Sequence, residues 1–281
     1  MKIKIAGVTF GYSDTSVLQD LWVDLDGPQL VSILGPNGVG KSTLVGCICK
    51  ILEPKGGAVL LDGTDVRDIG LKALSKEMGY VPVSSSDSFP MNVVDAVLMG
   101  RHPYSKWKTE DEDLEKVYDA LVRLDIEDLA MRQFNELSAG QHQKVVLARG
   151  LVQEPKVLLL DEPTSNLDIR HQIEVTKLLK ELSREKGMLI IMISHDINIA
   201  VTYSDNVLLM YNGGIFAAGR PWDVITEENI RTVYGVDCKI VDFKGNPHVI
   251  LDDTVELSTD EQWEQPYTSE DHPALAMQDK G

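Results

Sequence analysis

The sequence contains few cysteines and no excess of positive charge. Its 281 residues include three cysteines, which show no metal-ligand spacing with histidine and are too few for a disulfide framework. A reducing cytosol is therefore the simplest setting. Lys and Arg number 27 against 44 Asp and Glu, which gives a net charge of -17. Such a chain is poorly suited to non-specific binding of a nucleic-acid backbone or an anionic membrane surface, and we expect no nucleic-acid partner.

The sequence also lacks a long apolar run. The longest runs, VLLL and MLIIMI, are far shorter than the roughly 20 residues that a membrane-spanning helix needs. The N-terminal MKIKIAGVTFGY alternates apolar and polar residues from the start, which is typical of a strand and not of a signal peptide. Any work at a membrane therefore has to go through a partner.

Short apolar strands alternate with helices along most of the chain. Residues 92–150 show mainly helical apolar spacing, and a further helix is predicted around residues 175–182. Fully apolar strands between helices are typical of a parallel sheet that is covered on both faces, so the sequence predicts an α/β fold. The predicted strands are residues 3–10, 30–34, 58–63, 157–162 and 188–195.

A glycine-rich loop follows the predicted strand 30–34. The stretch GPNGVGKS fits the phosphate-binding pattern G-x-x-x-x-G-K-[ST] and opens a helix. The glycines let backbone N–H groups surround a phosphate, and the helix N-terminus adds partial positive charge. Lys41 is expected to reach the β- and γ-phosphates of ATP, and the Ser42 hydroxyl to bind Mg²⁺. The predicted nucleotide-binding residues here are Gly35, Pro36, Asn37, Gly38, Val39, Gly40, Lys41, Ser42 and Thr43.

Two adjacent carboxylates end the predicted strand 157–162. Asp161 suits the Mg²⁺ side of a phosphate site, and Glu162 suits a general base aimed at water in line with the γ-phosphate. Alone, such a pair more often begins a helix or faces solvent. Together with the glycine loop, it predicts hydrolysis of a nucleoside triphosphate.

Two further motifs, LSAGQ at 137–141 and SNLD at 165–168, complete a recognisable set. From about residue 3 to 240, the chain resembles the nucleotide-binding subunit of an ATP-binding-cassette (ABC) transporter. The resemblance implies a P-loop NTPase (RecA-like) core with an N-terminal antiparallel β region and an inserted helical subdomain at about residues 88–150. We expect an ABC ATPase domain over residues 1–250. The acidic remainder, 251–281, has little periodicity and is predicted to be a weakly ordered tail.

The resemblance assigns roles to three single residues. Tyr12 resembles the aromatic residue that stacks on adenine. His195, at the end of MLIIMISH, resembles the switch histidine that contacts the γ-phosphate and the attacking water. Asp168 resembles the residue that links the two active sites across a dimer.

The LSAGQ stretch resembles the family signature, which meets the γ-phosphate bound by the opposite subunit. Ser138, Gly140 and Gln141 match this signature, and Ala139 replaces a more usual glycine. Ser138 and the N-terminus of the following helix would make a second anion site. Since one chain cannot fold this site onto its own glycine loop, the resemblance implies two chains closed head to tail around two ATP molecules.

One position departs from the family pattern. The strand that ends in Tyr80-Val81-Pro82 is normally followed by a glutamine that reaches the metal and water, whereas this chain has Val83. Valine can neither donate nor accept a hydrogen bond, so we expect slower or less tightly coupled hydrolysis with ATP still bound. Alternatively, Ser84 or Ser85 moves in to replace the missing contact.

The chain carries one cassette, which resembles importer subunits more than fused exporters. FPMNVVDAVLMGRHPY (89–104) and GRPWDVITEENIRTVYGVD (219–237) resemble the importers of iron–siderophore, haem and vitamin B12. The resemblance implies a homodimer on the cytoplasmic face of the membrane, held there by permease subunits, with an extracytoplasmic substrate-binding protein completing the system. Import of zinc or manganese, a soluble non-transport ABC ATPase, and a nucleotide-binding regulator remain as alternatives.

Overall fold

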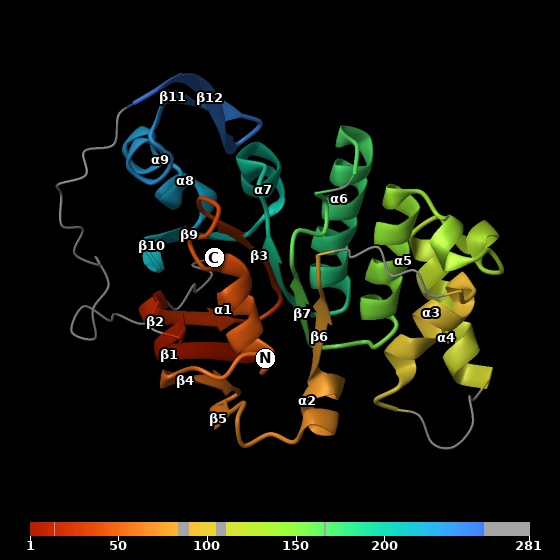
Figure 1. Ribbon diagram of the computed structural model, residues 1–281. Coiled ribbons are helices and arrows are strands. Elements are labelled where there is room, and N and C mark those ends of the chain that lie inside the picture. Colours follow the sequence, from red (N-terminus) through yellow and green to blue (C-terminus); the bar gives the residue numbers. More distant parts are fainter. Residues whose placement is uncertain (14, 84–89, 105–110, 166, 256–281) are drawn as a thin grey trace.

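The computed structural model describes residues 1–13, 15–83, 90–104, 111–165 and 167–255. Its centre is a six-stranded sheet in the order β10-β9-β3-β8-β7-β6 (Figure 1). The five strands from β9 to β6 run parallel, and β10 pairs with β9 as an antiparallel edge strand. These strands are β3 (Gln29–Leu34), β6 (Met78–Val81), β7 (Val157–Leu160), β8 (Leu189–Ile193), β9 (Asn206–Tyr211) and β10 (Gly214–Gly219).

A second, antiparallel sheet contains the N-terminus and has the order β2-β1-β4-β5. The register between β1 and β2 shifts between Ile5 and Val8, at the point where Gly7 interrupts the apolar alternation of the sequence. The predicted N-terminal strand is therefore confirmed, together with its irregularity. The four strands are β1 (Lys2–Tyr12), β2 (Thr15–Asp26), β4 (Gly56–Leu61) and β5 (Thr64–Asp65).

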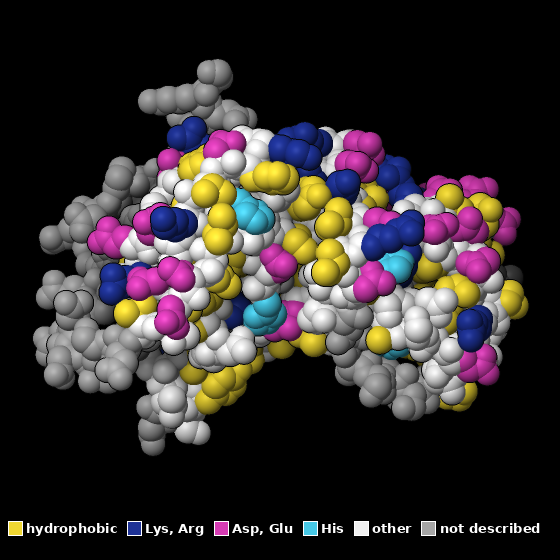
Figure 2. Space-filling view, turned by 90° about the horizontal axis from the view of Figure 1, so that it is seen from above, with side chains coloured by type: hydrophobic (Ala, Val, Ile, Leu, Met, Phe, Trp, Pro, Cys, Tyr) yellow, Lys and Arg dark blue, Asp and Glu magenta, His cyan; other side chains and the backbone are white. Residues whose placement is uncertain are grey.

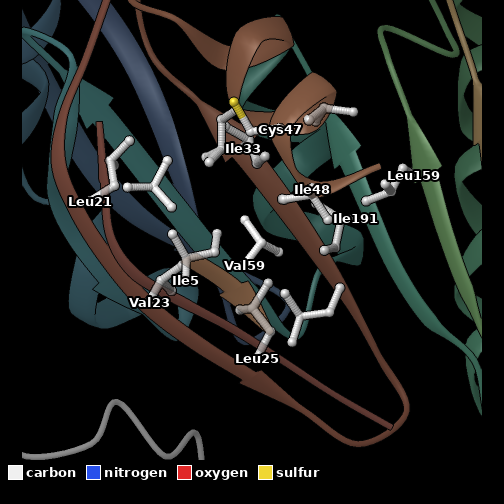
Figure 3. Close-up of a cluster of buried hydrophobic side chains, with 14 of the residues drawn as sticks. Ile5, Leu21, Val23, Leu25, Ile33, Cys47, Ile48, Val59, Leu159 and Ile191 are labelled. Carbon is white, nitrogen blue, oxygen red and sulfur yellow. The ribbon is translucent and has the colours of Figure 1, made fainter. Parts of the chain in front are cut away.

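The central sheet is buried on both faces, because neighbouring residues of a strand point in opposite directions. In β7, Leu159 packs with helix α1 (Lys41–Ile48) and the antiparallel sheet, whereas Leu158 packs with the helices on the other side. Figure 3 shows the first of these cores, where Leu159 and Ile191 of the central sheet lie beside Ile48 of α1. This two-sided burial explains why the strands read as continuous apolar runs.

A helical layer covers the second face of the sheet (Figure 1). Most of the helices that the spacing predicts between residues 92 and 150 are present, as is the predicted helix after the carboxylates. The layer contains α3 (Val93–Leu98), α4 (Asp111–Arg123), α5 (Ala139–Leu151) and α6 (Ile169–Glu185), with short 3₁₀ turns at Met99–Arg101, Glu127–Leu129 and Phe134–Glu136. Helix α2 (Leu71–Glu77) leads into β6.

A third cluster of buried side chains joins β9 to the C-terminal elements. Those elements are α7 (Ile197–Tyr203), α8 (Pro221–Val224), α9 (Glu227–Tyr234) and a two-stranded sheet of β11 (Val236–Phe243) and β12 (Asn246–Thr254). Strand β12 continues past residue 250, where the sequence predicts the acidic tail to begin, and residues 256–281 lie outside the described residues. Among the helices that the structure describes, none is long and apolar enough to cross a membrane.

The central core makes a first prediction. Leu159 of the central sheet is fully buried against α1 and the antiparallel sheet. Leu159→Ala therefore leaves a cavity and should lower the free energy of unfolding by about 2–5 kcal/mol. The matched control is Leu71→Ala on α2, because the Leu71 side chain is 69% exposed. Urea unfolding of the two variants measures the difference, and equal losses would contradict the proposed core.

Candidate nucleotide site

The site lies where three adjacent parallel strands end. Strands β3, β8 and β7 are neighbours in the sheet, and their carboxyl ends meet at one edge. In an open α/β sheet this edge is the usual place for a ligand. In Figure 1 the parallel strand β6 runs upward, so the carboxyl ends of the parallel strands point to the top of that view. Figure 2 shows the molecule from above and therefore looks onto these ends.

The loop after β3 has a backbone that only glycine can adopt at its first position. Gly35 has a φ of 145°, and a Cβ atom there would lie 2.4 Å from the carbonyl oxygen of Met210 in β9. Gly38 has a φ of 80°, but a Cβ there would meet nothing within 4 Å. The first glycine is therefore needed for packing against β9, and the second lies on the open side of the loop.

Lys41 begins α1 and folds back over the loop that precedes it. Its Nζ donates to the carbonyl oxygens of Gly35 at 2.7 Å and Pro36 at 2.8 Å. Burial lowers the pKa of Lys41, and the nearby carboxylates of Glu162 and Asp161 partly offset that effect. A buried cation next to backbone N–H groups is the chemistry that binds phosphate.

Ser42 and Asp161 bring two oxygen atoms together beside Lys41. The Ser42 hydroxyl donates to Asp161 Oδ1 at 3.1 Å, although the two residues are far apart in the sequence. Asp161 follows β7 directly, and its backbone N–H donates to the Val81 carbonyl oxygen of β6. Burial raises the pKa of Asp161, the Ser42 hydroxyl opposes this, and the Glu162 carboxylate adds to it.

Glu162 and His195 are in direct contact, at the ends of β7 and β8. The distance from His195 Nε2 to Glu162 Oε1 is 2.6 Å. Glu162 has a left-handed backbone with a φ of 50°, a conformation that costs a non-glycine residue about 1–2 kcal/mol. The Ser165 hydroxyl donates to the Glu162 carbonyl oxygen, which stabilises the turn. The strained turn thus holds the Glu162 carboxylate beside the histidine.

A depression of about 950 Å³ adjoins the outer part of the loop. Its wall includes Pro36–Val39, Thr15–Val17 at the start of β2, and the β9–β10 turn around Asn212. Tyr12 lies at its margin, because it pairs with Thr15; its side chain is 55% exposed and its ring meets that of Phe10 edge-on. The sequence analysis predicted Tyr12 but missed the contributions of β2 and of the β9–β10 turn.

The signature residues form a separate group at the start of α5. Ser138 and Gln141 make a capping box, in which the Ser138 hydroxyl accepts from the Gln141 N–H at 3.3 Å and the Gln141 side chain accepts from the Ser138 N–H at 3.1 Å. Among the described residues, no hydrogen bond or ion pair joins Ser138 to the loop at 35–42. Ala139 and Gly140 are the first two residues of the helix.

A second depression, of about 560 Å³, lies beside this signature group and is lined by Ser138, Gly140, Gln141, Lys144 and His171 together with Asp125–Leu129. Asp168 is close by as the N-cap of α6 and accepts from both His171 N and His171 Nδ1. These hydrogen bonds lower the pKa of Asp168. The pairing of Asp168 with His171 was missed, although the spacing Asp-x-x-His at a helix start is a usable signal.

Val83 follows β6, and the carboxylates follow the neighbouring parallel strand β7, so the two segments leave the sheet side by side. Its side chain is 40% exposed, and the carbonyl oxygen of Val81, two residues earlier, accepts from the N–H of Asp161. Ser84 and Ser85, the alternative donors, lie outside the described residues, as does Asn166 of the SNLD motif.

These residues together can bind a polyphosphate and activate water. The loop and Lys41 supply positive charge, Ser42 and Asp161 supply the oxygen ligands that Mg²⁺ prefers, and Glu162 can accept a proton. Two protein oxygens fit Mg²⁺, because this ion usually keeps several waters. In the part of the chain that the structure describes, no group of three or more His, Cys, Asp or Glu residues could hold a metal by itself.

A sequence profile of the ABC transporter family matches residues 18–165, which is more than half of the chain. The chain belongs to the ABC transporter family. ATP-binding subunits of this family hydrolyse ATP, so this cassette is an ATPase. The family assignment, the P-loop NTPase fold class and the enzymatic activity expected from the sequence are all confirmed.

Curated relatives of this cassette cover most of its length. It is 44% identical over 250 residues to an uncharacterized ABC transporter ATP-binding protein of Methanocaldococcus jannaschii (89% of this chain, 98% of that protein). It is 36% identical over 249 residues to the ferric enterobactin transport ATP-binding protein of Escherichia coli (86% and 91%). Identity to the cobalamin import ATP-binding protein of Halobacterium salinarum is 35% over 234 residues (83% and 59%).

Solved structures resemble this cassette to a similar extent. An ABC transporter assigned to the metal-chelate type, in an inward-facing conformation, superposes with a TM-score of 0.77 at 29% identity (89% of this chain, 96% of that chain). A dimeric bacterial ABC transporter cassette superposes with a TM-score of 0.69 at 27% identity (78% and 98%). Both comparisons agree with the α/β fold described above.

The glycine loop makes a second prediction. Gly35→Ala places a methyl group against the Met210 carbonyl and should lower the free energy of unfolding by at least about 3 kcal/mol. Gly38→Ala serves as the matched control, since it adds only left-handed strain of about 1 kcal/mol. Urea unfolding of the nucleotide-free variants compares the two, and a Gly38→Ala loss as large as that of Gly35→Ala would contradict the packing described for β3 and β9.

Proposed function

We propose that this cassette uses ATP to power the uptake of an iron complex or of cobalamin through a separate membrane permease. The observation that carries this proposal is the agreement between the hydrolytic residues that meet at one edge of the sheet and relatives named for transport of ferric enterobactin and import of cobalamin. A structural relative of the metal-chelate type supports the same kind of cargo. The proposed location is the cytoplasmic face of the membrane, with a binding protein delivering cargo outside.

Within one chain, the loop 35–43 and Lys41 bind the ATP phosphates, and Ser42 and Asp161 hold Mg²⁺. When bound, the ion supplies charge that offsets the phosphate oxygens. Glu162 takes the proton of the attacking water, and His195, already 2.6 Å from Glu162, orients that carboxylate and faces the γ-phosphate. Tyr12, at the margin of the depression beside the loop, stacks on the adenine.

The second half of each site comes from another copy of the chain. The Ser138 hydroxyl accepts from Gln141 N–H, so its own hydrogen remains available to donate to a phosphate oxygen. The N-terminus of α5 adds partial positive charge at the same place, in line with the predicted roles of Ala139, Gly140 and Gln141. Asp168 links the two sites. A structural relative described as dimeric supports the formation of a homodimer, for which we propose a head-to-tail arrangement.

One alternative keeps a specific observation in its favour. Val83 lacks the polar atoms of the usual glutamine, which would suit a nucleotide-binding regulator that does not hydrolyse ATP. The contact between Glu162 and His195 argues against it, because a regulator needs no base. An importer of zinc or manganese would hydrolyse ATP in the same way, and it would differ from the main proposal only in the substrate that it transports.

The proposed function can be tested by co-expression with a permease encoded beside the gene and with its binding protein. We expect the cassette to co-purify with the permease and to drive ATP-dependent uptake of a ferric siderophore or cobalamin into proteoliposomes. Uptake of zinc or manganese alone would identify the other cargo class. Failure to associate with any permease, or bound ATP without turnover in the complex, would contradict the proposal.

Val83 generates the third prediction. Val83→Gln restores a side chain that can hydrogen-bond to water near Asp161, and we expect ATP turnover in the permease complex to rise by up to about 10–100-fold. Val83→Leu is the matched control, because it changes size without adding a polar atom. ATPase rates measured with and without transport cargo give the readout. Unchanged turnover in Val83→Gln would mean that valine does not impair the site.

A further inference from the structure

The C-terminal hairpin carries an apolar surface that no described element covers. On the outer face of β11 and β12, the side chains of Val241, Phe243 and Ile250 are 39%, 54% and 51% exposed. Alternate residues on the other face, including Ile240 and Val249, pack into the third buried cluster. We call the three exposed side chains the hairpin patch.

Basic groups border the hairpin patch. Lys239 pairs with Ile250 across the two strands, and Lys244 Nζ lies 5.3 Å from the centre of the Phe243 ring. The ring of His248, which pairs with Val241, lies 5.7 Å from the Phe243 ring. Asp242 and Asp252 are also exposed on these strands, so the border of the patch carries both signs of charge. An apolar surface flanked by two lysines suits a segment that combines aromatic side chains with acidic ones.

Side chains from the body of the protein occupy the edges of the hairpin. Asn198 of α7 bonds to both backbone groups of Val249, donating to its carbonyl at 3.1 Å and accepting from its N–H at 2.8 Å. On the other strand, the Ile240 N–H donates to Glu227 of α9. A ligand of this hairpin would therefore meet its outer face and would not extend the sheet.

The chain itself continues from the end of this hairpin. The Val255 N–H donates to the Gly235 carbonyl oxygen, which fixes the end of β12 beside the start of β11. Residues 256–281 follow directly, and an extended chain advances by about 3.3 Å per residue, so they are long enough to reach the patch. Between residues 256 and 271 this segment has no Lys or Arg, and it contains Trp263, Tyr267 and the acidic residues Glu256, Asp260, Glu261, Glu264, Glu270 and Asp271.

We propose that the C-terminal segment, residues 256–281, docks on the hairpin patch of its own chain. Trp263 and Tyr267 cover Val241, Phe243 and Ile250, and the acidic residues face Lys239 and Lys244. A second copy is a poorer occupant, because two identical patches would bring the same lysines to both sides of one interface, whereas the C-terminal segment brings opposite charge. The covalent link also gives the segment a local concentration in the millimolar range.

Hydrogen exchange of the full-length protein tests this docking. We compare the wild type with Trp263→Ala/Tyr267→Ala, which leaves every described residue unchanged, and with Val241→Ser/Ile250→Ser in the patch. The amides of residues 256–281 should exchange about tenfold faster in both variants, as expected when a segment at millimolar local concentration loses a site of about 0.1 mM affinity. Leu71→Ser, a similarly exposed site on α2, is the control and should leave this exchange unchanged.

Two results would overturn the proposal. The first is exchange of residues 256–281 at the free-chain rate in the wild type, with no change in either variant. The second is protection that rises with protein concentration, together with patch-dependent dimers in sedimentation velocity, because that result would assign the patch to a second copy. Exchange in residues 236–254 of the patch variant shows independently whether the hairpin remains folded.

Discussion

The parallel pairing of β3, β8 and β7 is the constraint on which the rest of the site depends. Their register places Ile33 opposite Ile193, and Leu160 opposite Met192, so the loops that follow these strands leave the sheet at the same edge. Burial on both faces holds this register, since a slip of one residue would exchange the side chains that pack against α1 with those that pack against the helical layer. The glycine loop, the carboxylates and His195 are therefore brought together by the packing of the strands that precede them.

The position of the site at this edge explains the shifted pKa values of its charged residues, and it also explains why one chain forms only part of the site. Lys41 and Asp161 are both buried, and burial works against the charged form of each, lowering the pKa of the lysine and raising that of the aspartate. A bound phosphate would replace the loop carbonyls as the partner of Lys41. Ser138, by contrast, caps its own helix and has no described contact with the loop at 35–42. The account therefore requires a second chain to supply the other side of the phosphate.

Much of this arrangement could be predicted from the sequence, because strong local signals coincide with it. The apolar runs of β7 and β8 predicted strands buried on both faces, and the glycine pattern predicted the loop that follows β3. The contacts of individual side chains left no such signal. Nothing in the local sequence shows that His195 meets the distant Glu162, or that Lys41 bonds to the carbonyls of its own loop. The continuation of β12 to Thr254 was missed because an acidic run resembles a tail, although β11 pairs with it.

The central claim, that each hydrolytic site is shared between two chains, can be tested by mixing two inactive variants. Glu162→Gln removes the base of one half-site, and Ser138→Ala removes the signature hydroxyl of the other. A dimer of either variant has no intact site, whereas a mixed dimer has one. The account predicts that ATPase activity absent from each variant alone appears when the two are combined. If the mixture stays inactive while mixed dimers form, or if Ser138→Ala alone keeps full activity, the shared site is contradicted.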